Sequence, residues 1–431
     1  MTQVAERLET WVAAFEAFGR EPGFGADGLR GARTAAFERF LQRGFPTTRD
    51  EEWRFTNVAP IAASAFARAA AAVPEPSALA PFRLPDGAAH ELVIVNGRLA
   101  PQLSSAGAPA GVAIRSLKDD LARTPDDLRP DEPSTPFVDL NTAFFEDGVV
   151  IDVTPGAVVS TPIHVLHVTA VEGAPAMVAP RLVIRAGEQS QVTVIESYVS
   201  LTDAESFTNA VTQALVGPAA VVDHVKLQRE PSRTFHLATI VATTARAGVF
   251  RSHAITLGGR LVRNDFLSRL AGEGAECTLN GLYVADGETL VDTHTTIDHT
   301  EPHCPSHEVY KGILSGTAKA VFNGKIIVRQ KAQKTDAKQT NKALLLSDHA
   351  QINSKPQLEI FADDVRCTHG ATVGQLDADQ LFYLRARGLD PVTARNMLIH
   401  AFAGDVLAGV RVDAVRELTL RLVDEKLSIR P

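Results

Sequence analysis

GVVIDV (residues 148–153) opens a long region of strand-like sequence, and QVTVIE (residues 191–196) repeats the same texture further along the chain. Both stretches are rich in β-branched residues, which favour an extended backbone. A Gly or Asp, a small residue and an alternating strand then recur, starting at Gly187, Gly217, Gly248, Gly272, Gly316 and Asp348. Short strands at roughly regular intervals, with no long helix between them, predict a β-sandwich or a β-solenoid.

Two features of this region favour the solenoid. Its turn signals often lack the two-residue form that the hairpins of a meander need. Polar residues also lie inside strand-like runs, where stacked coils can align them into hydrogen-bonded ladders; they are Asn264, Asn280, Thr295 and Asn323. Periodicity alone does not separate parallel from antiparallel pairing, so both arrangements stay open at this point.

Helical patterns precede the strand-rich region. Leu8, Trp11 and Phe15 share one face at helical spacing, and a second pattern stops at GFP (residues 44–46), where a Gly is followed by a Pro. The run of small residues from Ala62 to Ala72 is also predicted to be helical.

Three amphipathic helices are predicted after the strand-rich region. Asp377 has the position of an N-cap for the first helix, and Asp390 followed by Pro391 begins the second, which Gly404 ends. The third runs roughly over 408–427. The predicted buried faces are Leu381, Tyr383 and Leu384, then Met397, Leu398, Ala401 and Phe402, then Val412, Val415, Leu418 and Leu422. Such helices could cover the open edge of the β core or bind a partner.

These patterns divide the chain into four parts. Residues 1–75 are predicted to form an N-terminal helical region, and residues 76–147 a linker with the first strands. Residues 148–375 form the β core, and residues 376–431 a C-terminal helical region. The fold class that follows is mainly β, with α-helical regions at both ends.

Composition excludes several classes of protein. Of the 431 residues, 45% are hydrophobic, which is enough for a core and excludes global disorder. The net charge is -8 and the basic residues are scattered, so nucleic acid is not an expected partner. Cys277, Cys304 and Cys367 are too few and too far apart for a disulfide framework. Without an apparent signal peptide or membrane-spanning run, we expect a cytoplasmic protein that does not insert into membranes.

A first cluster of metal-ligand side chains lies between His294 and His307, where four imidazoles accompany Cys304. Histidine, cysteine and carboxylate are the usual ligands of zinc and iron. The spacing fits neither a zinc ribbon nor a metalloprotease helix, and Pro302 and Pro305 oppose a continuous helix. We therefore interpret this cluster as structural, with a metal site as the alternative.

A second cluster contains Cys367 and His369. They are two residues apart, so on a strand their side chains share one face, where they could bind a soft or borderline metal or hold the edge of a cluster. A buried cysteine beside a hydrogen-bonded histidine is the structural alternative. A Cys–His nucleophile is less favoured, because no oxyanion-hole signature accompanies the pair.

Common enzyme motifs are absent from the sequence. It has no GxxxxGK[ST] loop, no GxGxxG between a strand and a helix, and no GxSxG elbow. One alternative function is a β-helix enzyme, either a metal-dependent hydrolase or a polysaccharide lyase. Another is a homodimeric binding protein without metal.

Several long motifs resemble the SufB/SufD family of iron–sulfur cluster assembly proteins. They are FPTTRDEEWRFT (45–56), DTHTTIDH (292–299), YKGILSGTAKAVFNGKIIV (310–328), QTNKALLLS (339–347), PQLEIFADDVRCTHGATVG (356–374) and DQLFYLRARG (379–388). The last two are similar to the SufD branch rather than to the SufB branch. The resemblance covers most of the chain and is loosest over residues 60–145.

This resemblance implies a right-handed parallel β-helix core and a non-catalytic scaffold subunit. Such a subunit pairs with SufB through the core and binds the ATPase SufC, which hydrolyses ATP, through C-terminal helices that correspond to residues 377–431. A homodimer is the expected alternative when SufB is absent. A nascent iron–sulfur cluster is held transiently near the SufB–SufD interface, without a tightly bound cofactor. The family histidine proposed to serve that cluster corresponds to His369, and Cys367 corresponds to a neighbouring family cysteine.

Overall fold

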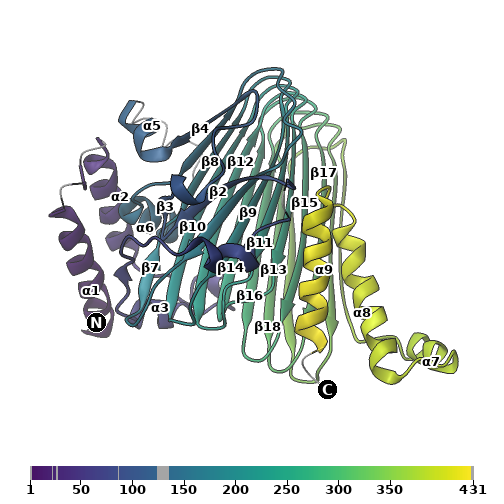
Figure 1. Cartoon of the computed structure of the whole chain (residues 1–431). Coiled ribbons are helices and arrows are strands. Elements are labelled where there is room, and N and C mark those ends of the chain that lie inside the picture. Colours follow the sequence, from purple (N-terminus) through teal and green to yellow (C-terminus); the bar gives the residue numbers. More distant parts are fainter. Residues whose placement is uncertain (1, 22, 26–27, 86, 124–134, 429–431) are drawn as a thin grey trace.

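The computed structural model describes residues 2–21, 23–25, 28–85, 87–123 and 135–428. Within these residues, two sheets face each other along the molecule, and the chain alternates between them (Figure 1). Neighbouring strands pair in parallel, apart from two antiparallel pairs near the N-terminal end. The chain is a parallel β-solenoid of about 8 turns with helical regions at both ends, which confirms the predicted fold class.

The described strands belong to these two sheets. The first sheet contains β1 (Ala67–Arg68), β4 (Val112–Ser116), β5 (Val149–Val153), β7 (Ala176–Val178), β8 (Arg181–Ala186), β10 (Ser206–Val216), β12 (Thr234–Thr244), β14 (Leu261–Leu270), β16 (Leu290–His299), β18 (Lys319–Val328) and β20 (Gln351–Ile360). The second sheet contains β2 (His90–Val95), β3 (Arg98–Leu99), β6 (Ile163–Thr169), β9 (Gln191–Ser200), β11 (Val221–Gln228), β13 (Val249–Thr256), β15 (Glu276–Ala285), β17 (Pro305–Leu314), β19 (Asp336–Leu345) and β21 (Arg366–Gly374).

Helices precede, interrupt and follow the strands. The α-helices in the described part of the chain are α1 (Thr2–Gly19), α2 (Arg30–Arg43), α3 (Ala59–Ala63), α4 (Pro76–Leu79), α5 (Leu117–Arg123), α6 (Pro136–Phe144), α7 (Ala378–Ala386), α8 (Pro391–Leu407) and α9 (Asp413–Ser428). Short 3-10 helices are η1 (Glu51–Trp53), η2 (Ala80–Phe82) and η3 (Pro101–Leu103). None of the described helices is long and apolar enough to cross a membrane.

The recurring glycines mark the turns between coils, where the backbones of successive coils approach closely. A Cβ atom on Gly217 would lie 2.6 Å from the carbonyl oxygen of Ala186 in the preceding coil. Because no side chain fits there, only glycine allows this close approach. The recurring glycines that predicted repeated strands are therefore explained by the close stacking of successive coils.

The main hydrophobic core lies between the two sheets. Because strands pair in register, side chains at matching positions stack from coil to coil, as Val194 does beneath His224. The rings of Tyr310 in the second sheet and Phe322 in the first lie 5.2 Å apart across this space. We call this space the lumen; its lining includes buried polar side chains as well as the apolar core.

The helices cover the outer faces of the sheets. Near the N-terminus, Trp11 of α1 contacts Phe40 of α2 and Phe207 of β10, with 6.4 Å between ring centroids in both pairs. Near the C-terminus, α8 packs on the second sheet with Ile399 and Ala403 (Figure 1). The N-terminal and C-terminal helices therefore cover opposite sheets of the solenoid.

The helix predicted over Ala62–Ala72 is wrong beyond Ala63. Helix α3 ends there because Ser64 is extended, and β1 then pairs with β7. Phe66 is buried just before β1. Alanine favours a helix but contributes little packing energy, so burial of the neighbouring phenylalanine decides the local structure.

Two of the three C-terminal helices, α7 and α8, differ from the prediction in their buried faces. The first, α7, buries no residue, although Leu381, Tyr383 and Leu384 were expected to face the core. Helix α8 buries Ala394, Ile399, Ala403, Val406 and Leu407, and the expected face of Met397, Leu398, Ala401 and Phe402 is exposed or only partly buried. It also continues past Gly404, and the next helix begins at Asp413. Helical periodicity locates apolar stripes but does not say which one the rest of the protein covers.

Candidate functional site

The last coil of the solenoid is open. Strand β20 pairs only with β18, and β21 pairs only with β19, so each leaves one backbone edge without a strand neighbour in the described chain. Most residues of β21 are exposed, whereas the corresponding strands of the inner coils are largely buried. Long, flat edges of this kind are sites where another chain can add a strand.

Cys367 and His369 lie on β21 and share its lumenal face. The register pairs Cys367 with Ala337 and His369 with Gln339 of β19. Both partners are buried, with exposed fractions of 0% and 2%, so their side chains point between the sheets. Cys367 is half-buried against Ile326 and its neighbours, and burial raises the pKa of its thiol. His369 is exposed at the mouth of the lumen.

The two side chains supply one sulfur and two ring nitrogens at the mouth. Among the residues that the structure describes, no group of three or more His, Cys, Asp or Glu side chains could hold a metal ion. Iron in iron–sulfur clusters is commonly held by about four thiolate or imidazole ligands. The pair could therefore contribute to an iron site shared with another molecule.

The cluster predicted between His294 and His307 is dispersed by the fold. His299 faces the lumen, where its Nε2 lies 3.0 Å from the hydroxyl of Ser306. His303 occupies a turn with a φ of 61°, and His307 is exposed on β17. His294 lies on β16 and points outward toward the N-terminal segment. This dispersal agrees with the structural interpretation.

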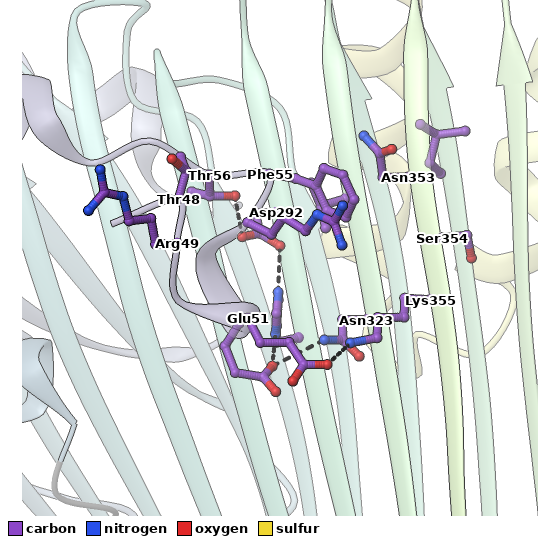
Figure 2. Close-up of a pocket in the computed structure, with 15 residues that line it drawn as sticks. Thr48, Arg49, Glu51, Phe55, Thr56, Asp292, Asn323, Asn353, Ser354 and Lys355 are labelled. Atoms are coloured by element: carbon purple, nitrogen blue, oxygen red, sulfur yellow. Dashed lines mark hydrogen bonds and ion pairs between the residues drawn. The ribbon is translucent and has the colours of Figure 1, made fainter. Parts of the chain in front are cut away.

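A cavity of about 670 Å³ lies where the N-terminal segment 48–56 crosses the outer face of the first sheet. Figure 2 shows its lining side chains, which come from this segment and from strands β16, β18 and β20. Glu51 pairs with Lys355 of β20, and Glu52 accepts a hydrogen bond of 3.1 Å from Asn323 of β18. These two contacts attach the segment to the last two strands of the first sheet, β18 and β20.

His294 is the centre of this attachment. Its Nδ1 lies 3.2 Å from Glu52 and its Nε2 lies 3.1 Å from Asp292. Burial alone would lower the pKa of His294, but the charge of Asp292 and the hydrogen bonds to Asp292 and Glu52 raise it to about 9. The two carboxylates favour the cationic form of the ring, although Nε2 also lies 3.3 Å from the guanidinium of Arg263, whose charge lowers the pKa. Both ring nitrogens are thus occupied by contacts within the protein.

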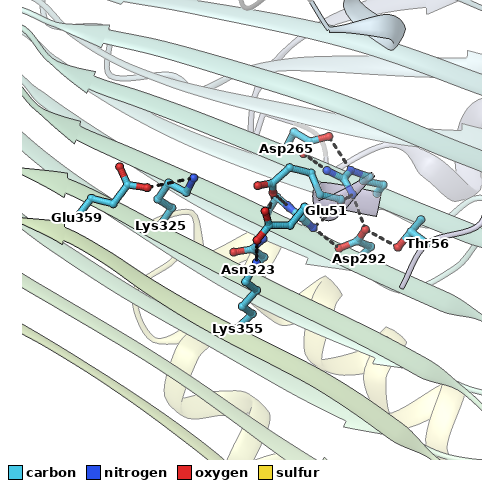
Figure 3. A network of polar contacts seen from close by, with 11 residues as sticks. Glu51, Thr56, Asp265, Asp292, Asn323, Lys325, Lys355 and Glu359 are labelled. Carbon is cyan, nitrogen blue, oxygen red and sulfur yellow. Dashed lines mark hydrogen bonds and ion pairs between the residues drawn. The ribbon is translucent and has the colours of Figure 1, made fainter. Parts of the chain in front are cut away.

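Arg263 completes the polar network drawn in Figure 3. It donates to Asp292 over 2.7 Å and forms a two-point contact with Asp265, with distances of 2.8 and 2.9 Å. Its guanidinium lies 3.8 Å from the ring centroid of Trp53. Thr56 donates to Asp292 over 2.6 Å. We call the set Glu52, Trp53, Thr56, Arg263, Asp292 and His294 the N-terminal clamp.

The clamp and the exposed helices are features that sequence reasoning did not assign. The clamp residues 52, 53 and 56 lie in one of the motifs that resemble the SufB/SufD family. The motif gave no sign that Thr56 contacts Asp292, which lies 236 residues further along the chain. On α7 and α8, four large apolar side chains are exposed: Phe382 (74%), Tyr383 (56%), Val392 (59%) and Met397 (49%). Tyr383 and Met397 were predicted to lie on buried faces, whereas Phe382 and Val392 were assigned to no face.

Comparisons with known proteins give a consistent relationship. Residues 167–402 match the family described as "SUF system FeS cluster assembly, SufBD core domain", and residues 25–165 match the SufBD protein N-terminal region. An iron–sulfur cluster assembly SufBD family protein of Synechocystis is 36% identical over 84% of this chain and 83% of its own length. SufD of Escherichia coli is 33% identical over 94% of this chain and 95% of its own length. SufD of Bacillus subtilis is 25% identical over 67% of this chain and 66% of its own length.

Proposed function

Because this chain belongs to the SufBD family of iron–sulfur cluster assembly proteins, we propose that it is a SufD-type scaffold subunit that pairs with SufB and binds SufC. In this role it helps to build or hold a nascent cluster and catalyses no reaction itself. The observation that carries the proposal is the open last coil, which presents Cys367 and His369 at a pairing edge.

Pairing with SufB through the last coil is supported by the free edges of β20 and β21. These strands are ten and nine residues long, and their outer backbone groups have no strand partner within the described chain. A related solenoid can satisfy these groups by placing its own edge strands against them. Such pairing would cover the lumen mouth and place ligands from both subunits around it.

Binding of SufC is supported by the exposed apolar side chains of α7 and α8. Phe382 and Met397 contribute large side chains that no other part of the described chain covers. Exposed aromatic and methionine side chains are enriched at the centres of protein interfaces. ATP-driven closure of SufC would then move the attached subunits relative to one another and open the SufB–SufD contact.

His369 is proposed as a ligand of iron or of the nascent cluster, with Cys367 as a neighbouring contact. Iron and sulfide are the cargo of the reaction, and imidazole is an established cluster ligand. Cys367 is a weaker donor than an exposed cysteine because burial raises the pKa of its thiol. The remaining ligands would come from SufB.

The test is anaerobic copurification of this chain with SufB and SufC, followed by measurement of stoichiometry, iron and sulfide. His369→Ala should lower the cluster content several-fold and leave the complex intact, whereas His307→Ala, an exposed histidine on β17, should change neither. Phe382→Ser should release SufC and retain SufB. Wild-type cluster content in His369→Ala would contradict the ligand role, and a chain that binds neither partner would contradict the scaffold role.

A further inference from the structure

A column of polar side chains leads from the lumen to His369. In the registers of the second sheet, Glu308 of β17 lies next to Gln339 of β19, and Gln339 lies next to His369 of β21. Side chains at matching positions of parallel strands project from the same face. Glu308 and Gln339 are 1% and 2% exposed, so the column is buried until it reaches the open coil.

Gln339 is held in one orientation from two sides. Its Nε2 donates a hydrogen bond of 2.7 Å to Oε2 of Glu308. Across the lumen its amide lies against Gly324 of β18, so closely that a Cβ atom at that position would collide with it. The amide is therefore fixed between the two sheets, and its nitrogen is directed to the carboxyl group.

This orientation leaves the amide oxygen without a donor. Oε1 of Gln339 is buried and makes no hydrogen bond with the residues that the structure describes. A buried acceptor without a donor is costly, on the order of 1–3 kcal/mol. The adjacent side chain in the column is His369, whose imidazole forms no hydrogen bond or ion pair in the described structure and carries one N–H in its neutral form.

We propose that Gln339, anchored by Glu308, is a positioning residue that accepts a hydrogen bond from one ring nitrogen of His369 and so directs the other nitrogen to iron. This inference rests on the proposed ligand role of His369. Histidines that bind metals nearly always donate their second N–H to a protein acceptor, which fixes the tautomer and the ring orientation. Here the acceptor would be the side-chain amide of Gln339, which is held by the buried carboxyl group of Glu308 on the neighbouring strand β17.

The direct test is ¹⁵N NMR of histidine-labelled full-length protein, free of metal, at about pH 8, above the ordinary imidazole pKa of about 6.5. His369 should populate one tautomer predominantly. Gln339→Met keeps the length of the side chain but removes the acceptor, and it should shift the nitrogens of His369 to the values of the exposed His307, which serves as the internal reference. Unchanged tautomer populations in Gln339→Met would overturn the proposal.

A second pair of variants keeps the test informative if Gln339→Met fails to fold. Glu308→Gln retains an oxygen that can accept from Gln339 and should preserve the His369 tautomer. Glu308→Leu removes the anchor and should reproduce the Gln339→Met spectrum. If both Glu308 variants gave the wild-type tautomer, the anchoring part of the proposal would be wrong.

Iron binding separates this inference from the proposed function. In the complex with SufB and SufC, Gln339→Met should weaken iron retention by about 10-fold or more, the usual effect of losing such a support. If His369→Ala leaves iron content unchanged while Gln339→Met alters the tautomer, the ligand role fails and the hydrogen bond stands. If His369→Ala loses iron while Gln339→Met alters neither tautomer nor iron, the ligand role stands and the positioning role fails.

Discussion

At the scale of single residues, the charge states of two buried groups decide how the protein responds to pH. The positive charge of His294 is stabilised by Asp292 and Glu52, which raise the pKa of the imidazole to about 9. Glu308 lies in the lumen and forms no ion pair with the described residues, and burial raises the pKa of its carboxyl group to about 7 against hydrogen bonding by Thr295 and Gln339. The two groups therefore act on stability over different pH ranges.

His294→Gln should destabilise the protein in a pH-dependent way. The folded-state pKa of about 9 lies above the ordinary value of 6.5, so the stabilisation is complete below about pH 6.5 and is lost as the pH rises through 9. The variant should lose up to about 3 kcal/mol of unfolding free energy at pH 6, and much less at pH 9.5. Denaturant unfolding at both pH values measures this; His307→Gln is the control. An equal loss at both would contradict the charge assigned to His294.

Glu308→Gln should stabilise the protein, whereas His294→Gln destabilises it. Because the folded-state pKa is about 7 and the ordinary value is 4.5, the folded state binds the proton more tightly, and stability falls as the pH rises from about 4.5 to 7. Because the glutamine side chain does not titrate, the stability of the variant does not fall over this pH range. It should match the wild type near pH 4.5 and exceed it by up to about 3 kcal/mol at pH 8. A variant that is less stable than the wild type at pH 8 would contradict the assignment.

Single residues also show where sequence reasoning was sufficient. Cys367 and His369 were predicted to share a strand face from their spacing alone, and the register places both beside lumenal residues. Their role as ligands stays a prediction. Gln339 and Glu308 lie 31 residues apart and the sequence gives no signal that joins them, because the length of a coil, which sets the register, depends on turns whose geometry the sequence does not state.

At the scale of elements, close packing across the lumen ties strands of opposite sheets together. Gly324 of β18 gives room to the Gln339 amide of β19, and its backbone φ does not require glycine. Glycine is therefore needed at this position to leave space for the Gln339 amide, and not for its backbone conformation. The C-terminal helices show the converse situation, since their apolar stripes are present in the sequence but lie partly outside the core.

Gly324→Ala should therefore destabilise the protein by about 1–3 kcal/mol, although alanine usually favours a strand over glycine. Combining it with Gln339→Ala should remove most of the additional loss, because the collision needs both side chains. Thermal or denaturant unfolding of the two single variants and the double variant forms the cycle. Strict additivity would show that the two residues do not share the space.

The elements differ in how far their boundaries could be predicted. Asp377 and Asp390 were expected to be N-caps, and each accepts hydrogen bonds from the backbone at the start of its helix. The end of α8 was misplaced because Gly404 remains helical and the burial of Val406 and Leu407 outweighs the weak helix preference of glycine. Capping hydrogen bonds, which involve residues close in sequence, can thus be predicted directly from the sequence. Helix ends that depend on tertiary packing cannot.

At the scale of the whole molecule, the solenoid form was predictable and its unequal ends were not. Recurring strands and glycines predicted stacked coils, but the parallel arrangement came from the family resemblance. The division of the chain into four parts stays a prediction. The N-terminal clamp joins segment 48–56 to β14 and β16. The contacts of the same segment with Asn323 and Lys355 reach β18 and β20, so the segment supports an otherwise exposed coil.

Stability should accordingly fall off toward the last coil. In a solenoid each coil contacts only its neighbours, so a terminal coil has half of the contacts of an inner coil. Backbone amides of β20 and β21 should exchange with deuterium faster than those of β11 and β12, and addition of SufB should protect β20 and β21 selectively. Equal protection of all strands in the free chain would contradict this gradient.

The unequal ends also limit the size of any assembly. At one end the sheets finish in short antiparallel strands, β4 with five residues and β3 with two, which offer little to an incoming strand. Within the described residues, only the last coil offers long strand edges without a neighbour. When two solenoids pair through these edges, both sets become occupied, so strand pairing stops at two solenoids related by a dyad and cannot continue into a fibre.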